Sequence, residues 1–405
     1  MNDISNVYET AIIGGGFSGA VAACVLSETF GEKIAVLERN KRIGKKIAAT
    51  GNGRCNITNS RIEKSRYHSA EGSPNLSVLE KYGSDSLREW ALSVGVPISF
   101  EGEKAYPCSR QASSVAEALS DKLSYERASV FYDFDCVSLV KQKDGLFVAS
   151  AEDGRKVVAK NVILACGGAA GKQYGTDGYG YTLAKGLGHS VTRIYPSVVQ
   201  LTTEREKLKG LKGVKVDAVV DAYVGSELVA SVRGDVLFTD YGVSGNAIFS
   251  VSSYIVGREN ASLRIGFLPE FSQSELSDLL KEKIALAPYV GEEKLLIGFV
   301  HGSVGRAVTA LTKKIDSPYA YADALAKNLK NFTLKVTGTL GFDSAQITRG
   351  GVRLSEINET TMESKLVNGL YMTGEILDVD GDCGGFNLQW AYSSARAAAE
   401  DILTK

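Results

Sequence analysis

The sequence predicts an α/β protein with a Rossmann-like domain, made of a parallel sheet with helices and a small β-meander. An antiparallel β-barrel domain with a nested helical subdomain is inserted into it. Three features predict this fold. A glycine-rich strand-turn-helix-strand opens the chain, short β-rich runs separated by glycine turns follow in the middle, and a glycine pair precedes the last helix.

The opening segment, Glu9 to Arg39, predicts a βαβ unit. The apolar run Ala11 to Ile13 reads as a strand, a helix continues to about Glu28, and Lys33 to Leu37 reads as a second strand. A glycine-rich turn joins the first strand to the helix. A unit of this kind forms the first half of a dinucleotide-binding fold.

Gly14, Gly16 and Gly19 have the GxGxxG spacing. It allows a tight turn, a close approach of backbone to a pyrophosphate, and close packing of helix on strand. Glu38 ends the second strand, where an acidic side chain accepts hydrogen bonds from ribose hydroxyls. A glutamate there, rather than a basic residue, argues against a 2′-phosphorylated adenosine at this site.

The segment Gly44 to Asn59, GKKIAATGNGRCNITN, is too polar and glycine-rich to be a core element. Its backbone N–H groups and the cations Lys45, Lys46 and Arg54 suit a loop over a pyrophosphate and an aromatic cofactor ring. A solvated basic loop is the alternative. Cys55 lies in this loop, either facing the ligand or as a buried inert thiol.

Apolar residues at helical spacing predict helices within Ser77 to Val94 and Ser113 to Tyr125. Val130 to Val140 reads as one strand, and the Asp-Gly pairs after it indicate the turns of a small meander. The apolar run Asn161 to Gly168, NVILACGG, predicts a strand that ends in a glycine pair, where the chain can pass beside a cofactor.

The composition changes near Pro196. Between Val198 and Phe267, β-rich runs alternate with glycine turns and predict a small antiparallel sheet or barrel. Helices follow, one of them expected at Glu292 to Phe299, before strand character returns at Leu334 to Gly341. The predicted domains are 1–192 plus 341–405 (nucleotide binding), 193–270 plus 331–340 (barrel) and 271–330 (helical subdomain).

Near the carboxyl end, Gly369 to Ala391 reads as strand, acidic turn, glycine pair and helix start. The carboxylates of Glu375 and Asp380 can accept hydrogen bonds from the hydroxyls of a ribityl chain. Gly384-Gly385 lets backbone approach a ligand at the positive end of the last helix. This combination suits a flavin ring, whose reduced form is anionic at its O2 edge. An ordinary glycine-rich turn with surface carboxylates is the alternative.

The 405 residues include 46 Lys and Arg and 47 Asp and Glu, a net charge of −1. This balance predicts a small-molecule substrate and neither nucleic acid nor a membrane surface as partner. No apolar run approaches a membrane span and no signal peptide is evident, so a cytoplasmic location is the default expectation. The six cysteines include no CxxC pair and no metal-ligand cluster, which disfavours a dithiol mechanism and a metal.

Four motifs resemble a known family. They are GGGFSGA at 14–20, GKKIAATGNGRCNITN at 44–59, TRGGV at 348–352 and GEILDVDGDCGGFNLQWA at 374–391. The chain resembles, over essentially its whole length, the BaiN/YhiN-like (aminoacetone-oxidase-like) bacterial NAD(P)/FAD-dependent oxidoreductases of the two-dinucleotide-binding-domain flavoproteins. The resemblance implies noncovalent FAD in an extended conformation and a likeness to fumarate-reductase-type flavoproteins. Ala395 stands where many relatives have glycine.

The predicted FAD contacts come from these motifs, together with Glu38-Arg39 at the end of the second strand, Val137 for adenine and the glycine pair after the NVILAC strand. They are Gly14, Gly15, Gly16, Phe17, Ser18, Gly19, Ala20, Glu38, Arg39, Lys45, Lys46, Thr50, Gly51, Gly53, Arg54, Cys55, Asn56, Val137, Gly167, Gly168, Gly374, Glu375, Asp380, Gly385, Phe386, Asn387 and Leu388.

Catalytic residues are not identified by sequence, because a flavin exchanges hydride at N5 while the protein supplies orientation and electrostatics. Arg349 is the candidate for a substrate-anion clamp, with a structural ion pair as its alternative. His68, His189 and His301 fit surface or structural roles better than proton relays.

Reduction of an activated double bond is the predicted reaction. No second GxGxxG unit follows a strand after Glu38, so NAD(P)H would dock transiently as donor. One alternative is a flavin oxidase of a small amine or ketone that uses oxygen. Others are a flavin-dependent RNA-modifying protein, which the balanced charge disfavours, and a non-catalytic FAD sensor.

Overall fold

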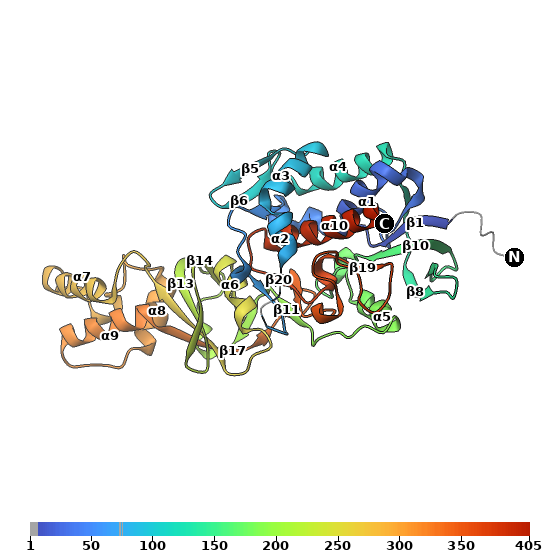
Figure 1. The fold of residues 1–405 in the computed structure, drawn as a ribbon. Coiled ribbons are helices and arrows are strands. Elements are labelled where there is room, and N and C mark those ends of the chain that lie inside the picture. The colour runs from blue at the N-terminus through green and yellow to red at the C-terminus, as the bar shows by residue number, and fades with distance from the viewer. Residues whose placement is uncertain (1–6, 73, 75) are drawn as a thin grey trace. The chain divides into compact units, whose positions relative to one another are not determined.

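The computed structural model describes residues 7–72, 74 and 76–405, and the chain divides into two compact units. The first unit contains Met1–Tyr195 and Ile347–Lys405, and the second contains Pro196–Gln346 (Figure 1). The strands β11 (Tyr195–Ser197) and β18 (Ile347–Arg349) lie where the chain passes from one unit to the other. The first unit is therefore built from both ends of the sequence.

The first unit is organised around one seven-stranded sheet. Its strand order is β7-β2-β1-β10-β9-β8, with β19 also paired to β10. The pairs that join β7, β2, β1, β10 and β19 are parallel, while β8 and β9 continue from β10 as an antiparallel meander. The strands are β1 (Val7–Ile13), β2 (Ile34–Leu37), β7 (Ser129–Phe131), β8 (Cys136–Lys141), β9 (Phe147–Ala151), β10 (Lys156–Leu164) and β19 (Leu370–Met372).

Helices α1 (Phe17–Phe30), α4 (Ala112–Tyr125) and α10 (Phe386–Thr404) pack together beside this sheet (Figure 1). Every residue of α1 from Phe17 to Ser27 is buried, so its apolar composition all round the helix matches its place within the core. Shorter helices complete the unit: α2 (Ser77–Lys81), α3 (Ser84–Ser93) and α5 (Tyr179–Gly186).

Two small sheets of the first unit border the candidate site. One has the order β3-β6-β5 and the other pairs β20 with β4. Their strands are β3 (Thr58–Asn59), β4 (Tyr67–His68), β5 (Ile98–Glu101), β6 (Lys104–Pro107) and β20 (Asp380–Gly381).

The second unit is a closed barrel with helices. The barrel order is β12-β15-β14-β13-β16-β17. Side chains of the barrel and of the helices belong to one apolar core, in which the rings of Phe238, Phe267 and Phe332 contact one another. The elements are β12 (Leu201–Thr203), β13 (Lys215–Val224), β14 (Glu227–Phe238), β15 (Gly242–Ser244), α6 (Asn246–Ile255), β16 (Ala261–Phe267), α7 (Gln273–Leu286), α8 (Gly302–Leu311), α9 (Pro318–Lys330) and β17 (Phe332–Thr339).

Three local predictions are corrected. Val130 to Val140 contains two strands, β7 and β8, because the chain turns at Asp133, whose φ is 52°. Glu292 to Phe299 contains only a single 3-10 turn, Glu292–Lys294. Helix α6 was not predicted, since its alternating serine and apolar residues read as part of the β-rich region.

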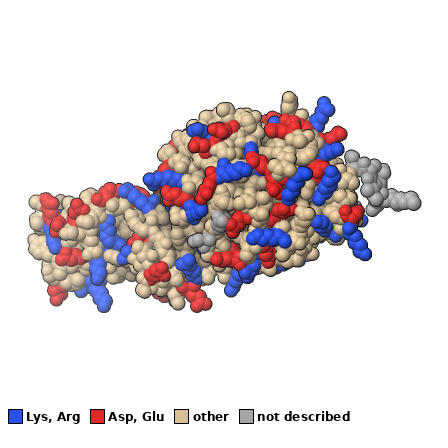
Figure 2. Space-filling view, viewed as in Figure 1, with Lys and Arg blue, Asp and Glu red and all other residues tan. Residues whose placement is uncertain are grey.

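Within the described residues, no helix has the length and apolar character needed to span a bilayer. Cationic and anionic side chains are intermixed over the face of each unit shown in Figure 2.

Candidate cofactor site

Four parallel strands end side by side and place the sequence motifs at one edge of the sheet. Ile13 is paired with both Leu37 and Leu164, and Leu164 is paired with Met372. The residues that follow these strands therefore meet at this edge. In open α/β sheets, ligands bind outside the carboxyl ends of the strands.

The three glycines of the first turn occupy different environments. A Cβ on Gly14, whose φ is 107°, would lie 2.5 Å from the Ala165 carbonyl oxygen, and one on Gly19 would lie 1.9 Å from the Gly14 carbonyl oxygen. A Cβ on Gly16 would meet no atom within 4 Å among the described residues. Gly14 and Gly19 are thus required by packing, whereas Gly16 borders open space at the start of α1.

Helices α1 and α10 begin in the same way. Each has a glycine N-cap, Gly16 or Gly385, without a side-chain hydrogen bond to the cap, and neither has an acidic residue in its first turn. The first N–H groups of a helix lack partners inside the helix and carry partial positive charge. Two such helix starts suit a ligand with two electron-rich regions.

Ser18, one residue inside α1, links that helix to the end of β19. Its Oγ lies 2.5 Å from Thr373 Oγ1, and a Cβ on Gly374 would lie 3.0 Å from Ser18 Cβ. Phe17 and Ala20 are buried beside it. These contacts hold the first turn of α1 against the turn that carries Glu375.

Glu38 is buried and holds the glycine turn. Its Oε2 accepts from the Gly15 N–H at 2.8 Å, and its Oε1 accepts from the Asn40 N–H at 2.7 Å. A carboxylate has about four acceptor positions, so a ribose hydroxyl can also donate to it. Arg39 is different, because its guanidinium lies 2.8 Å from both Asp135 and Asp177, and its charge is already compensated.

Lys46 and Glu375 connect the amino-terminal and carboxyl-terminal motifs. Lys46 Nζ lies 2.8 Å from Glu375 Oε2 and also donates to the Ala170 carbonyl at 3.0 Å. Glu375 Oε1 accepts from the Thr348 N–H at 2.9 Å, next to Gly168. Lys45 instead donates to Asn40 Oδ1 at 3.1 Å. Contacts of Glu375 and Lys46 thereby join the turn of Glu375 to three other predicted segments, which contain Lys46, Gly168 and Thr348.

The loop after Lys46 reverses direction through a series of positive φ angles, at Gly51, Asn52, Gly53 and Cys55, just after Thr50. Cys55 is fully buried, and burial raises the pKa of its thiol to about 11, which favours an inert thiol; its FAD contact stays a prediction. The side chain of Arg54 forms an ion pair with Glu101 at 2.5 Å.

Asn56 lies against the start of α10. A Cβ on Gly385 would be 2.9 Å from Asn56 Oδ1, and this buried oxygen has no hydrogen-bond partner among the described residues. A buried acceptor without a donor is costly. The Asn56 oxygen therefore fits a ligand that donates a hydrogen bond at the start of α10.

The turn before α10 is fixed by side chains. Asn387 accepts from the Gly381 N–H and donates to the Gly381 carbonyl, both at 2.8 Å, and Asn59 donates to the Gly384 carbonyl at 3.0 Å. Tyr67 donates to the Phe386 carbonyl at 3.2 Å. Leu388 packs partly buried on the core. The glycine pair is thus held in a defined conformation.

Three carboxylates of the turn Asp378 to Asp382 are buried, each with its own partners. Asp378 accepts from Ser69 Oγ and the Ala70 N–H, and Asp382 lies 2.8 Å from His68 Nε2. Sequence reasoning did not predict these contacts of residues 66–70, although the three acids at alternate positions were a signal.

Asp380 is paired with Arg349. The Arg349 Nε lies 3.1 Å from Asp380 Oδ1, and the two side chains are 11% and 0% exposed. Burial raises the pKa of Asp380 to about 6, and the Arg349 guanidinium opposes this rise. The structural ion pair expected as the alternative for Arg349 is present.

Val137 and Gly167 lie near the meander and the β10 turn. Val137 is 37% exposed on β8, and its carbonyl accepts from the Tyr179 hydroxyl at 3.0 Å. Gly167 has a φ of 71° in the turn that follows β10. Their FAD contacts stay predictions.

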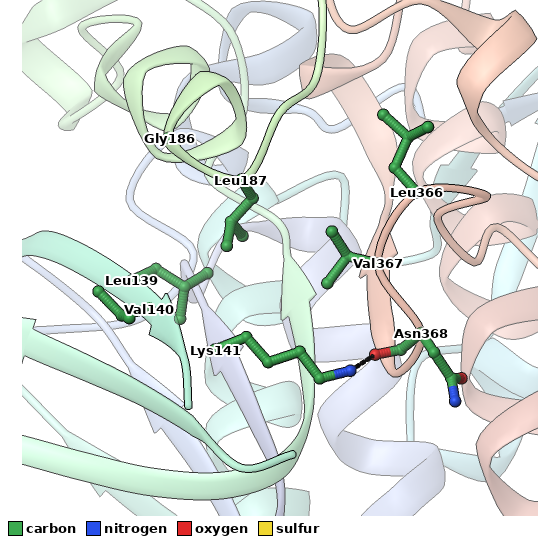
Figure 3. A pocket seen from close by; sticks show the side chains of 8 residues that line it. All are labelled: Leu139, Val140, Lys141, Gly186, Leu187, Leu366, Val367 and Asn368. Atoms are coloured by element: carbon green, nitrogen blue, oxygen red, sulfur yellow. Dashed lines mark hydrogen bonds between the residues drawn. The ribbon is translucent and has the colours of Figure 1, made fainter. Parts of the chain in front are cut away.

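A separate pocket of the first unit lies on β8, α5 and the loop before β19 (Figure 3). Its walls combine aliphatic side chains with polar groups, and Lys141 donates to the Asn368 carbonyl at its rim. It is lined by Leu139, Val140, Lys141, Gly186, Leu187, Leu366, Val367 and Asn368. It contains none of the predicted cofactor residues. In the part of the chain that the structure describes, no group of three acidic, histidine or cysteine side chains could hold a metal ion.

Comparison with known sequences gives matches over nearly the full chain. The model of the HI0933-like protein Rossmann domain family matches residues 8–401. A 3-dehydro-bile acid delta(4,6)-reductase of Clostridium scindens is 37% identical, over 96% of this chain and 98% of the relative. A ribosomal RNA dihydrouridine synthase of Escherichia coli is 28% identical over 98% of each, and one of Haemophilus influenzae is 29% identical over 98% and 99%.

Solved structures share the fold at low identity. A 3-ketosteroid delta1-dehydrogenase of Sterolibacterium denitrificans has a TM-score of 0.53 at 12% identity, over 99% of this chain and 100% of the other. A 3-ketosteroid-delta4-(5alpha)-dehydrogenase of Rhodococcus jostii has a TM-score of 0.51 at 15% identity, over 100% and 99%. Both are similar in fold.

Proposed function

The chain belongs to the HI0933-like Rossmann family of flavoprotein oxidoreductases, and we propose that it is an FAD-dependent reductase of a carbon–carbon double bond conjugated to a carbonyl group. The observation that carries the proposal is the pair of uncapped helix starts, Gly16 on α1 and Gly385 on α10, in the unit where the strand ends meet. FAD has a pyrophosphate and a ring edge that becomes anionic on reduction, and each suits one helix start.

The residues present fit FAD at defined points. The backbone of the Gly14–Gly16 turn would bind the pyrophosphate, and Glu38 would accept from the adenosine ribose. Glu375, beside Lys46, would accept from the ribityl chain. The unpartnered Asn56 oxygen would accept from the N–H of the pyrimidine ring, next to the first N–H groups of α10.

Two named relatives support the substrate chemistry. A delta(4,6)-reductase of a 3-dehydro-bile acid and a dihydrouridine synthase both saturate a carbon–carbon double bond conjugated to a carbonyl. When bound, FAD supplies hydride transfer, taking hydride from NAD(P)H and delivering it from N5. One reduced nicotinamide and one proton are consumed for each double bond saturated.

Arg349 is the residue of this chain that we assign to the substrate carbonyl. Negative charge moves to that oxygen when hydride reaches the conjugated carbon, and a guanidinium stabilises it. Asp380 positions the guanidinium through the 3.1 Å contact at Nε. The buried pair keeps the orientation of Arg349 fixed before substrate arrives.

The test is an anaerobic titration of the purified protein. We expect a yellow protein with FAD, bleaching by NAD(P)H, and return of the flavin absorbance on addition of a 3-oxo-4-ene steroid or another conjugated enone. A protein that NAD(P)H does not bleach, but that a small amine or ketone bleaches before oxygen restores its colour, would establish the oxidase alternative instead.

A second candidate substrate is a uracil ring within RNA. Residues 41–66, which include the loop around Asn56, contain eight Lys and Arg and one acidic residue, although the whole chain has a net charge of −1. Five of these cations already pair with acidic side chains, namely Lys46, Arg54, Arg61, Lys64 and Arg66. The other three, Lys41, Arg42 and Lys45, suit a phosphate backbone, and two relatives are named for ribosomal RNA.

The RNA candidate has its own test. Chemically reduced protein is mixed with ribosomal RNA that lacks dihydrouridine, and nucleoside mass spectrometry measures the product. Reoxidation of the flavin by the enone but not by RNA would reject this second candidate.

A further inference from the structure

Two arginines lie against one tyrosine ring on the β3-β6-β5 sheet. The guanidinium carbons of Arg54 and Arg110 are 4.5 Å and 4.8 Å from the centre of the Tyr106 ring. Tyr106 is 8% exposed, whereas both arginine side chains reach solvent, at 42% and 33% exposed. Aromatic rings hold guanidinium groups in this way at sites where planar groups stack.

The charges of this cluster are not balanced. Both arginines approach the same carboxylate oxygen, Glu101 Oε2, with Arg54 NH2 at 2.5 Å and Arg110 NH1 at 3.6 Å. The second distance is too long for a hydrogen bond, and Arg110 NH1 is buried with no hydrogen-bond partner among the described residues. One carboxylate thus serves two cations, and one buried donor lacks an acceptor.

The backbone at Arg110 supports a specific role for this side chain. Its φ is 55°, in the left-handed region that most side chains avoid. Strained positions of this kind gather where the surrounding structure fixes a functional group. Here the conformation directs the guanidinium back over Tyr106 and Glu101.

The cluster lies one strand from the candidate cofactor turn. Tyr106 is on β6, which pairs with β3 through Thr58 and Ala105. The next residue of β3, Asn59, donates to the Gly384 carbonyl at 3.0 Å. A dinucleotide bound at the cluster could therefore extend toward the start of α10.

We propose that Arg54, Tyr106 and Arg110 bind the 2′-phosphorylated adenosine of NADPH, the hydride donor. This inference rests on the proposed function, which requires a nicotinamide donor although the sequence has no second GxGxxG unit after Glu38. The two guanidiniums bind the phosphate monoester through those of their N–H groups that reach solvent, and adenine stacks on a guanidinium plane.

The cluster selects NADPH over NADH by this contact. NADH has a hydroxyl in place of the 2′-phosphate, so it leaves both guanidiniums with only Glu101 as their anion. Hydrogen bonds to charged groups change affinity by about tenfold or more. The hydride transfer itself is the same for both donors.

The first experiment measures binding without turnover. Isothermal titration calorimetry of the FAD-loaded protein uses adenosine 2′,5′-bisphosphate and, as control ligand, adenosine 5′-monophosphate. The main variant is Arg110→Asn, because asparagine tolerates the left-handed backbone and removes the charge. Arg61→Ala is the matched control, since Arg61 pairs with Glu103, and both side chains are largely exposed.

The expected result is that the bisphosphate binds and the monophosphate binds far more weakly. Arg110→Asn then raises the dissociation constant of the bisphosphate about tenfold, and Arg61→Ala leaves it unchanged. Glu101→Gln removes the carboxylate that competes with the phosphate, so it should lower the dissociation constant of the bisphosphate. This change is opposite in sign to that of Arg110→Asn. A cluster with a purely structural role would not give two opposite changes. Failure of the bisphosphate to bind, or equal binding by Arg110→Asn, overturns the proposal.

A second binding experiment distinguishes the phosphate of NADPH from the phosphates of RNA. If Arg110→Asn weakens binding of a short RNA but not of the bisphosphate, the cluster contacts a nucleic acid backbone and the NADPH assignment is wrong. Stopped-flow bleaching should show a loss of NADPH preference in Arg110→Asn, because the NADPH rate falls more than the NADH rate.

Different results would contradict the proposed reaction and the proposed NADPH site. Dithionite-reduced protein that no conjugated enone reoxidises contradicts the proposed reaction, whatever the binding data show. Intact enone reduction without NADPH preference contradicts the nucleotide site alone.

Discussion

Lys46 Nζ and Glu375 Oε2 lie 2.8 Å apart, although their residue numbers differ by 329. Their side chains are 23% and 20% exposed, so the ion pair is partly shielded from water. Glu375 also accepts from the Thr348 N–H at 2.9 Å. This pair fixes the cationic loop near the amino terminus against the acidic turn near the carboxyl terminus.

Breaking this pair should lower both stability and FAD affinity. Lys46→Met and Glu375→Gln each lower the melting temperature, and a double-mutant cycle gives a coupling of about 1 kcal/mol, since partly buried pairs exceed exposed ones. The exposed pair Lys212–Asp240 is the control and should show no measurable coupling. Additive effects of the two site mutations would contradict the interaction.

Substitutions of Gly16 and Gly19 distinguish a glycine that leaves room for a ligand from one that is required by packing. Gly16→Ala should leave the melting temperature of the FAD-free protein unchanged, because its Cβ meets no atom within 4 Å, yet should sharply reduce FAD retention. Gly19→Ala should reduce folded yield with or without FAD, because its Cβ would lie 1.9 Å from the Gly14 oxygen. Undiminished FAD content in Gly16→Ala would place the pyrophosphate elsewhere.

His189 should make stability fall as the pH drops below about 6.5. Its buried ring lies 3.0 Å from Glu356 through Nδ1 and 2.8 Å from Ser364 Oγ through Nε2. Burial lowers the pKa of His189, opposed by Glu356. The unfolded chain therefore binds this proton first as the pH falls, and folding stability declines.

The measurement for His189 is the melting temperature between pH 8 and pH 5. The wild-type protein should lose more stability over this range than His189→Gln, which lacks the titrating group. If the curve of His189→Gln runs parallel to the wild-type curve, His189 has the same pKa in the folded and unfolded states and the prediction is wrong.

Removing Arg349 should leave a buried carboxylate without its cation. Arg349→Met is expected to cost about 3 kcal/mol at pH 8, and adding Asp380→Asn should restore most of it, because the uncompensated charge is then gone. Thermal denaturation of the two variants measures both effects. An equal loss in the single and double variants would mean that packing, rather than charge, dominates this site.

Asp380 has a pH dependence of opposite sign to His189. Its pKa is about 6 in the folded protein, raised chiefly by burial, against about 3.9 in the unfolded chain. The folded state therefore binds this proton first, and the group adds stability as the pH falls from about 7 to 4. Asp380→Asn should remove that contribution, seen as a steeper loss of melting temperature on acidification than in wild type.

Much of the fold was predictable because its signals are local. The βαβ unit, the meander, the barrel region and the final helix each follow from hydrophobic periodicity and glycine turns, and the family and fold class are confirmed. Errors fell where local signals conflict with tertiary contacts. Val130 to Val140 is mostly β-prone apart from Asp133 and Asp135. Phe134 between them is buried and its N–H donates to the Glu38 carbonyl, which bends the chain away from a single strand.

The sequence by itself determined which residues belong to the nucleotide turns, since glycine spacing and an acid after the second strand are features of one short segment. Tertiary structure decided which of them have room for a ligand. It separates Gly16 from Gly14 and Gly19, compensates Arg39 internally, and leaves Asn56 Oδ1 without a described partner. It also brings Arg54 and Arg110 onto one ring. Such relationships depend on distances between segments far apart in the chain, which folding fixes and local sequence does not encode.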